Sequence, residues 1–285
     1  FICLYSSPFT MLITETIVDI DTKTGKMRLH VFRPLVDGAV KFGAVIVYSE
    51  IYQVTGPVER LARKYAAQGL IVVAPEVYHE MEPLGTVLPY DGPGTDRGNA
   101  NKLKKTIADF DSDAKSLVDY LIKRDDCNGR IGTFGLCLGG HLALRAAISE
   151  SPRVLASACF FPTDIHTPKS LGKDGNDTLA RIGDAKPPCE LLMVFGKQDN
   201  HTPQKEAINV IRTAMLDADL DFSWLELNVR HAFLRDELSK GRYDAPLAQH
   251  TLALSIELFQ RRLILGVPSQ SKLTPQKTAQ GPQNC

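Results

Sequence analysis

The sequence predicts an α/β protein in which a doubly wound, mostly parallel sheet is flanked by helices. Three observations support this fold class. Short runs of β-branched and apolar residues recur along the chain, helical stretches separate them, and chemically capable polar side chains follow the ends of several runs. Regular alternation of buried strands and amphipathic helices is typical of this architecture.

The predicted strands are short and apolar on both faces, as expected for strands inside a parallel sheet. We expect them at 43–49, 70–74, 130–135, 156–161 and 190–195, with a further strand-like stretch at 222–228. The predicted helices lie between these strands or close the chain, at 58–68, 108–123, 138–149, 204–217 and 245–265. The stretch 78–101 is expected to be a loop.

Four polar residues come just after predicted strands. Glu50 follows the first run, Cys137 the run ending at 135, Asp199 the run ending at 195, and His231 the stretch ending at 228. In open α/β sheets the working site lies outside the carboxyl ends of the strands. We therefore expect these four side chains to converge on one rim of the sheet.

The segment Gly-Leu-Cys-Leu-Gly-Gly at 135–140 has the pattern of a nucleophile elbow, a sharp turn between a strand and a helix. Gly135 and Gly139 are the small residues that such a turn requires on either side of its nucleophile. At a helix N-terminus, unpaired N–H groups and the helix dipole favour the thiolate of Cys137. The alternative is that Cys137 is a small buried apolar residue, as lone cysteines commonly are. A dinucleotide site is not indicated, because the glycines do not form G-x-G-x-x-G.

A cysteine nucleophile needs a base, and the base usually needs an orienting acid. Cys137, Asp199 and His231 occur in the order nucleophile, acid, histidine that α/β-hydrolases use. The alternatives are a turn aspartate and a surface histidine. The other histidines are less suitably placed: His30 in a predicted edge strand, His141 inside the elbow helix, His250 in the last helix, and His79, His166 and His201 in loops.

Four separate segments resemble those of the dienelactone hydrolases (carboxymethylenebutenolidases). They are Tyr-Ser-Glu-Ile-Tyr, Gly-Leu-Cys-Leu-Gly-Gly, Gly-Lys-Gln-Asp and Arg-His-Ala-Phe-Leu-Arg, in that family's order, and the resemblance spans roughly residues 42–265. It implies an α/β-hydrolase fold with a catalytic triad of Cys137, His231 and Asp199.

The resemblance also implies roles for residues around the triad. Glu50 would contact the resting thiol, and the backbone N–H groups of Ile51 and Leu138 would form the oxyanion hole. Arg235 matches one of the family's carboxylate-binding arginines, and Arg97 is a looser match for the other. A guanidinium suits this task because its donors form a planar fork. The loop at 78–101 departs from the family's lactone-degrading members, which leaves the substrate open.

Composition indicates one soluble catalytic domain of ordinary charge. The 285 residues include 33 basic and 33 acidic side chains, so no nucleic-acid partner is expected, and no apolar run is long enough for a membrane span. Six cysteines without a C-x-x-C pair suggest free thiols in a reducing compartment, hence the cytoplasm, and no zinc site. We expect residues 1–10 to be an extension, 11–266 a single domain and 267–285 a disordered tail.

Together these features predict a hydrolase that cleaves a small ester or lactone, with or without a carboxylate, through a thioester intermediate. No metal or organic cofactor is expected, and the protein is expected to be a monomer or weak homodimer. Two alternatives remain: a non-catalytic binding protein with this fold, and a redox-sensing thiol protein, because a reactive cysteine is readily oxidised.

Overall fold

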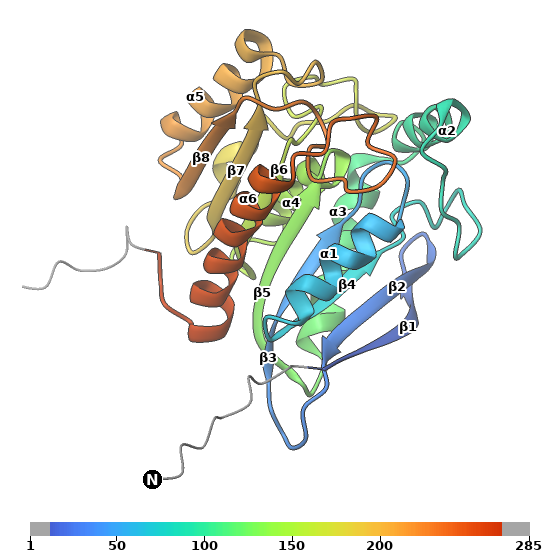
Figure 1. Ribbon diagram of the computed structural model, residues 1–285, viewed down its shortest axis with the longest axis vertical. Helices are drawn as coiled ribbons and strands as arrows, with labels where there is room; N and C mark the ends of the chain where they lie inside the picture. Colours follow the sequence, from blue (N-terminus) through green and yellow to red (C-terminus); the bar gives the residue numbers. More distant parts are fainter. Residues whose placement is uncertain (1–11, 270–285) are drawn as a thin grey trace, which may run out of the picture.

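Within residues 12–269, which the computed structural model describes, the chain forms an eight-stranded sheet (Figure 1). The strand order is β1-β2-β4-β3-β5-β6-β7-β8; β2 runs antiparallel to both its neighbours, and all other pairs are parallel. The strands are β1 (Ile13–Thr22), β2 (Gly25–Pro34), β3 (Phe42–Tyr48), β4 (Leu70–Pro75), β5 (Cys127–Leu136), β6 (Val154–Phe160), β7 (Glu190–Gly196) and β8 (Phe222–Leu227).

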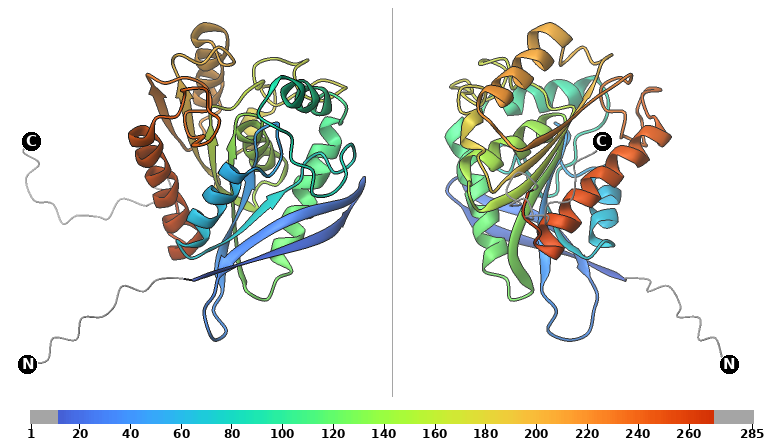
Figure 2. Two further views of the ribbon diagram at one scale, coloured as in Figure 1. Left: turned by 45° about the vertical axis from the view of Figure 1, so that its right-hand side comes forward. Right: turned by 90° about the vertical axis from the view of Figure 1, so that its left-hand side faces the viewer.

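Helices cover both faces of this sheet (Figures 1 and 2). Those described are α1 (Gly56–Ala66), α2 (Gly92–Lys102), α3 (Ile107–Ile122), α4 (Leu138–Ser149), α5 (Asn209–Asp217) and α6 (Ala245–Phe259), with short helical turns η1 (Ile182–Asp184), η2 (Gln204–Ile208) and η3 (Gln260–Leu265). On one face Tyr65 of α1 and Phe259 of α6 pack with Phe134 of β5. On the other face α3, α4 and α5 bury their apolar sides in a second core. The predicted α/β-hydrolase fold is confirmed, because each predicted strand and helix appears near its expected place.

The amino-terminal hairpin corrects one expectation. His30 was expected in an edge strand, but β2, which contains it, lies between β1 and β4, and β1 forms the edge. The strand β1 mixes charged and apolar residues and pairs along its whole length with β2. That pairing is fixed by a tight turn after Thr22 and not by a buried apolar run, so the hairpin has a weak sequence signal.

The expected loop at 78–101 is also wrong, because it contains most of α2. Few apolar residues and three glycines hide this helix from a search for amphipathic spacing. Its start is instead marked by capping: the side chain of Asp91 accepts a hydrogen bond of 2.7 Å from the N–H of Gly94, and a proline lies in the first turn.

The predicted end of the domain at 266 stays a prediction, and the chain just beyond it contacts the domain. The carbonyl of Val267 accepts a hydrogen bond of 2.9 Å from Arg262, and Ser269 is buried. These contacts are made by the carbonyl of Val267 and by Ser269, whereas the side chain of Val267 is exposed. The predicted extension at 1–10 and the remainder of the predicted tail, 270–285, lie outside the described residues. No helix within 12–269 is both long and apolar enough to cross a membrane.

Candidate active site

Cys137 lies in a sharp turn between β5 and α4. Its backbone has a φ of +57°, a region that side-chain-bearing residues rarely adopt. A Cβ at Gly135 would lie 1.8 Å from the carbonyl oxygen of Gly139, and a Cβ at Gly139 would lie 2.2 Å from that of Tyr48. Both positions therefore require glycine, and together they let the turn lift Cys137 to the rim of the sheet.

His231 and Asp199 form a hydrogen-bonded pair beside this turn. The Nδ1 atom of His231 lies 2.6 Å from Oδ2 of Asp199, and the side chain of Asp199 is fully buried. The other carboxylate oxygen accepts a 2.8 Å hydrogen bond from the N–H of His201. Burial alone would raise the pKa of Asp199, but these hydrogen bonds and the imidazole charge bring its pKa below the usual value. The carboxylate is thus kept ionised to orient the ring.

The imidazole of His231 also interacts with the thiol of Cys137. Burial disfavours the charged ring, yet the negative charges of Cys137 and Asp199, and the hydrogen bonds that the ring donates to both, raise the pKa of His231 to about 10. The ring is held between Phe161 and His201, with centroid distances of 5.0 and 4.5 Å. The environment therefore favours the protonated, imidazolium form of His231.

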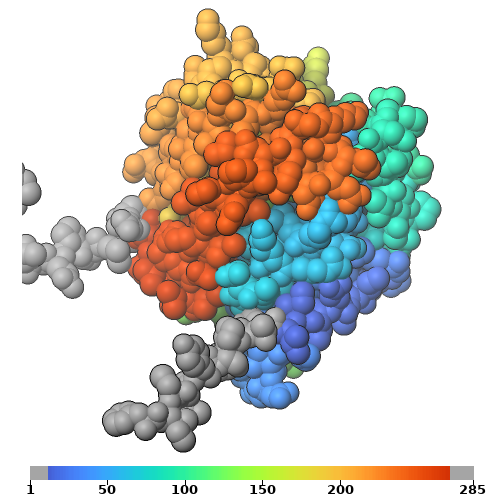
Figure 3. All heavy atoms as spheres, in the orientation of Figure 1, coloured from blue at the N-terminus to red at the C-terminus, as the bar shows by residue number. Residues whose placement is uncertain are grey.

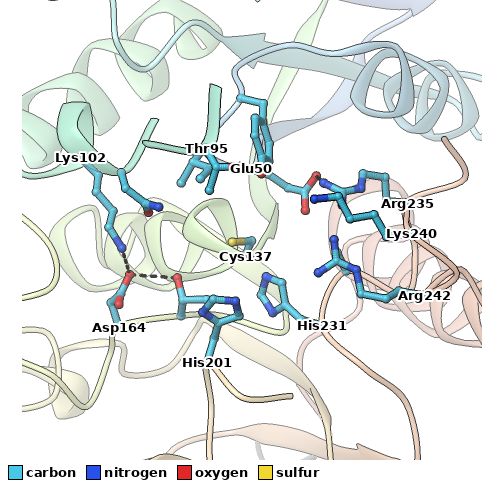
Figure 4. A pocket seen from close by; sticks show the side chains of 15 residues that line it. Glu50, Thr95, Lys102, Cys137, Asp164, His201, His231, Arg235, Lys240 and Arg242 are labelled. Carbon is cyan, nitrogen blue, oxygen red and sulfur yellow. Dashed lines mark hydrogen bonds and ion pairs between the residues drawn. The ribbon is translucent and has the colours of Figure 1, made fainter. Parts of the chain in front are cut away.

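A pocket of about 230 Å³ opens above the thiol (Figure 4). Glu50, Ile51, Cys137 and His231 line it, so three of the four residues expected at the sheet rim reach the pocket directly, and Asp199 joins them through His231. Leu138 is the first residue of α4, where backbone N–H groups have no partner within the helix. The structure thus brings the expected oxyanion donors, Ile51 and Leu138, next to the nucleophile turn.

Glu50 and Arg235 form a buried ion pair at one side of the pocket. Oε2 of Glu50 lies 3.3 Å from Nη1 of Arg235, and each side chain is only 4% exposed. Within residues 12–269 no hydrogen bond joins Glu50 to Cys137, so the expected contact of Glu50 with the resting thiol stays a prediction. The carboxylate of Glu50 instead balances the buried guanidinium of Arg235. Arg235 is further held 4.2 Å over the ring of Tyr90.

Arg97 does not belong to the pocket as described. Its guanidinium makes a two-pronged ion pair with Glu82, with Nε 2.8 Å from Oε1. The residues of α2 that do line the pocket are Thr95, Asn99 and Lys102, spaced as one helical face. Arg97 stands two residues from Thr95 and therefore points elsewhere.

Several pocket residues were not anticipated from the sequence. Lys102 and Asp164 form an ion pair of 2.7 Å at the side opposite Arg235 (Figure 4). Lys240 and Arg242 line the pocket from the segment between β8 and α6. In Figure 3 this segment, drawn in orange, lies against α1 and close to α2, and Arg60 of α1 binds its acidic residues Asp236 and Glu237. Of these residues, only Lys102 could have been found from the sequence, because it lies on the same helical face as Thr95 and Asn99, but the helix α2 was not predicted.

One other cluster has the donor types of a metal site. The ligand atoms of His79, Glu80 and Asp113 lie within 4.8 Å of one another. However, the ammonium group of Lys105 contacts both carboxylates, at 2.7 Å from Glu80. A buried positive charge therefore already balances this cluster, and burial with Lys105 nearby lowers the pKa of His79 to about 4.

This chain is similar to known proteins over most of its length. A family model described as "Dienelactone hydrolase family" matches residues 31–263. A Saccharomyces cerevisiae protein named "Putative carboxymethylenebutenolidase" is 44% identical over 261 residues, which cover 89% of this chain and 93% of that protein. The Pseudomonas putida carboxymethylenebutenolidase is 27% identical, over 85% of this chain and 94% of its own.

A solved structure gives the same picture of the fold. A dienelactone hydrolase-like promiscuous phosphotriesterase, P91, from metagenomic libraries has a TM-score of 0.71 at 18% identity, covering 88% of this chain and 99% of its own. At that identity the likeness supports the fold alone.

Proposed function

Because the chain belongs to the dienelactone hydrolase family, we propose that it cleaves a small ester or lactone with Cys137 as its nucleophile. The chain is a hydrolase of that family. The observation that carries the cysteine mechanism is the position of the thiol, on a strained elbow beside an imidazole that Asp199 orients. Such an arrangement activates a nucleophile and supplies a proton for the leaving group.

In the proposed first step, the thiolate of Cys137 attacks the carbonyl carbon of the substrate. Negative charge develops on the carbonyl oxygen, and the N–H groups of Ile51 and Leu138 are the proposed donors for it. When the intermediate collapses, the C–O bond to the leaving group breaks and the imidazolium of His231 protonates the departing alkoxide. A thioester on Cys137 remains.

In the second step, His231 takes a proton from water, which attacks the thioester carbonyl. Breaking the C–S bond releases a carboxylic acid and restores the thiolate and imidazolium. An ester thus yields an acid and an alcohol, and a lactone yields one hydroxy acid. Thiolate is a better leaving group than an amide nitrogen, so the design suits esters and not peptide bonds.

The pocket favours small substrates that carry a negative charge. A volume of about 230 Å³ holds only a small molecule, and basic side chains line much of its wall. The proposed role of Arg235 is to offer its guanidinium to a carboxylate of the substrate, because charge-assisted donors recognise that group well.

The test is Cys137→Ala measured with a small aryl ester and by mass spectrometry. We expect kcat to fall by about 10³-fold or more, because the nucleophile is lost. Wild-type protein quenched during turnover should carry the mass of the acyl group on the peptide containing Cys137. A circular dichroism melt controls for folding, since the turn accepts a smaller side chain.

Unchanged turnover in Cys137→Ala would transfer the chemistry to another residue. Ser49 would then be the next candidate, although it is fully buried.

A further inference from the structure

The wall of the pocket beside Arg235 carries two more cations, Lys240 and Arg242 (Figure 4). Resting on the function proposed above, we infer that Lys240 and Arg242 form the subsite for a carboxylate of the ester or lactone substrate. Arg235 is already paired with Glu50, so the positive charge without an ion-pair partner that selects an anionic substrate comes from Lys240 and Arg242.

The charges lining the pocket largely cancel in pairs. Glu50 neutralises Arg235 at 3.3 Å, and Asp164 neutralises Lys102 at 2.7 Å. Asp199 is committed to His231. Lys240 and Arg242 remain, and within the part of the chain that the structure describes neither has an acidic group within ion-pair distance. Among the described residues, the pocket therefore presents two positive side chains without an ion-pair partner on one side of the thiol.

The conformation of the loop that carries Lys240 and Arg242 directs their side chains toward the pocket. Leu238, Lys240 and Gly241 all have positive φ values, of 46°, 55° and 73°, which bend the chain into a tight turn. The carbonyl of Ser239 accepts hydrogen bonds from the backbone N–H of Arg242 at 3.2 Å and from its Nε at 2.9 Å. This contact orients the guanidinium and leaves its two terminal nitrogens available for a ligand.

The acidic residues of the same loop do not cancel these charges. Asp236 and Glu237 lie 2.7 and 3.0 Å from Nη2 of Arg60 on α1. That network turns both carboxylates toward α1, and it ties the loop to the body of the domain. The loop thus directs its negative charge outward and its positive charge into the pocket.

The ligand chemistry follows from the donors and the space. Arg242 can present a planar pair of N–H groups to a carboxylate, and Lys240 adds a mobile point charge at the exposed mouth. Because the pocket is small, the carboxylate and the ester bond that is cleaved must belong to one compact molecule. The expected substrate is a small ester or lactone with a carboxylate a few bonds from its carbonyl.

The experiment compares a matched ester pair, the 4-nitrophenyl monoester of glutaric acid and its methyl ester, with Lys240→Ala, Arg242→Ala and the double variant. For the double variant, the ratio of kcat/KM for the anionic over the neutral ester should fall about ten- to a hundredfold. Arg242→Ala should account for most of the change, since exposed charges such as Lys240 are screened by solvent. Arg242→Lys should restore part of the preference.

The matched control is Lys64→Ala, which removes one exposed positive charge from α1, away from this pocket. Its preference ratio should equal that of wild type. Arg235→Ala is a poor probe, because it would uncover the buried charge of Glu50 and change the pocket in two ways at once.

A binding arm separates this inference from the proposed function. Adipate, titrated by calorimetry, should bind wild type and Cys137→Ala alike and bind the double variant at least tenfold more weakly; this readout needs no turnover. An unchanged preference ratio in the double variant, or equal adipate binding by wild type and double variant, overturns the subsite. If Cys137→Ala kept its turnover while adipate still bound the wild type and bound the double variant more weakly, the proposed function would be overturned and the subsite would stand.

Discussion

At the scale of single residues, the backbone of Cys137 is held at a positive φ by close neighbours. Gly135, Gly139 and Tyr48 lie so close together that neither glycine position has room for a Cβ atom. A non-glycine residue in this region costs on the order of 1–3 kcal/mol. The cost is offset by the packing of β5 and α4, and in this conformation the thiol interacts with His231 and lines the pocket.

The raised pKa of His231 predicts the pH dependence of turnover. Because the pKa of His231 is about 10, the ring stays protonated up to alkaline pH and loses its proton as the pH rises through that value. Since the imidazolium must protonate the leaving alkoxide, kcat/KM for a neutral ester should be level from about pH 7 to 9 and fall above about 10. Steady-state kinetics across this range measure the effect.

Asp199→Asn provides the control for this pH profile. It removes a charge and a hydrogen bond that raise the pKa of His231, so the alkaline decline should move to lower pH. A wild-type decline centred near pH 6.5 would instead show an ordinary histidine, uncoupled from the thiol.

At the scale of elements, α2 matters because it packs closely against Ile51 in the segment after β3, residues 50–51, which carries a proposed oxyanion donor and is called the oxyanion loop below. A Cβ at Gly98 would lie 2.4 Å from the carbonyl oxygen of Ile51, whereas a Cβ at Gly92 of the same helix would meet nothing within 4 Å. Tyr78 adds a hydrogen bond of 3.0 Å from its hydroxyl to the carbonyl of Gly98. Gly98 therefore packs the helix against Ile51, and the hydrogen bond from Tyr78 ties Gly98 to the segment after β4.

Gly98→Ala should reduce kcat, because its methyl group must displace Ile51 from its place beside the thiol. We expect a loss of about tenfold or more in kcat, since a misplaced oxyanion donor costs up to 10²–10³-fold, and a stability loss of about 1–3 kcal/mol. The measurements are kcat, KM and the melting temperature with a neutral ester.

Gly92→Ala is the matched control on the same helix and should keep kcat within about twofold of wild type. Equal kcat values for Gly98→Ala and Gly92→Ala would show that α2 does not position the oxyanion loop.

At the scale of the whole molecule, the two-sided packing of the sheet separates the thiols into two classes. Cys127, Cys159 and Cys189 are buried, whereas Cys137 is partly exposed in the pocket. Burial raises the pKa of Cys127 and Cys189 as well, and it raises the pKa of Cys159 to about 12. The core that contains Cys127, Cys159 and Cys189 therefore keeps their thiols neutral and out of reach of solvent.

This separation predicts selective alkylation of the native protein. A short pulse of iodoacetamide at neutral pH should modify Cys137 at least about a hundredfold faster than the three buried thiols, because only thiolates react readily. Peptide mapping by mass spectrometry measures each site, and reads Cys3 and Cys285 separately.

Unfolding in urea should make the buried thiols of residues 12–269 react alike. Modification of Cys159 or Cys189 at the rate of Cys137 in native protein would mean that the sheet opens locally. It would also favour the redox-sensing alternative, since a second reactive thiol could then pair with Cys137.

The sequence by itself determined the sheet core and the order of the proposed catalytic residues. Buried strands and amphipathic helices are recognised from the local periodicity of their apolar residues. The elbow at 135–140 is recognised because Gly135 and Gly139 stand where the turn has no room for a Cβ atom. The order of Cys137, Asp199 and His231, each just past a predicted strand, was enough to place them on one rim, since carboxyl ends of parallel strands share an edge.

Only the tertiary structure decided how the charged residues of the pocket pair. Glu50 and Arg235 are 185 positions apart, and α2 is held by a cap and by glycine contacts that leave no apolar pattern. Arg97 forms an ion pair with Glu82 and does not line the pocket. Lys240 and Arg242 belong to no recognisable sequence motif, yet they line the pocket. The physical reason is that an ion pair depends on distance in space, and local sequence carries no record of which distant carboxylate packing will bring within 4 Å of a given cation.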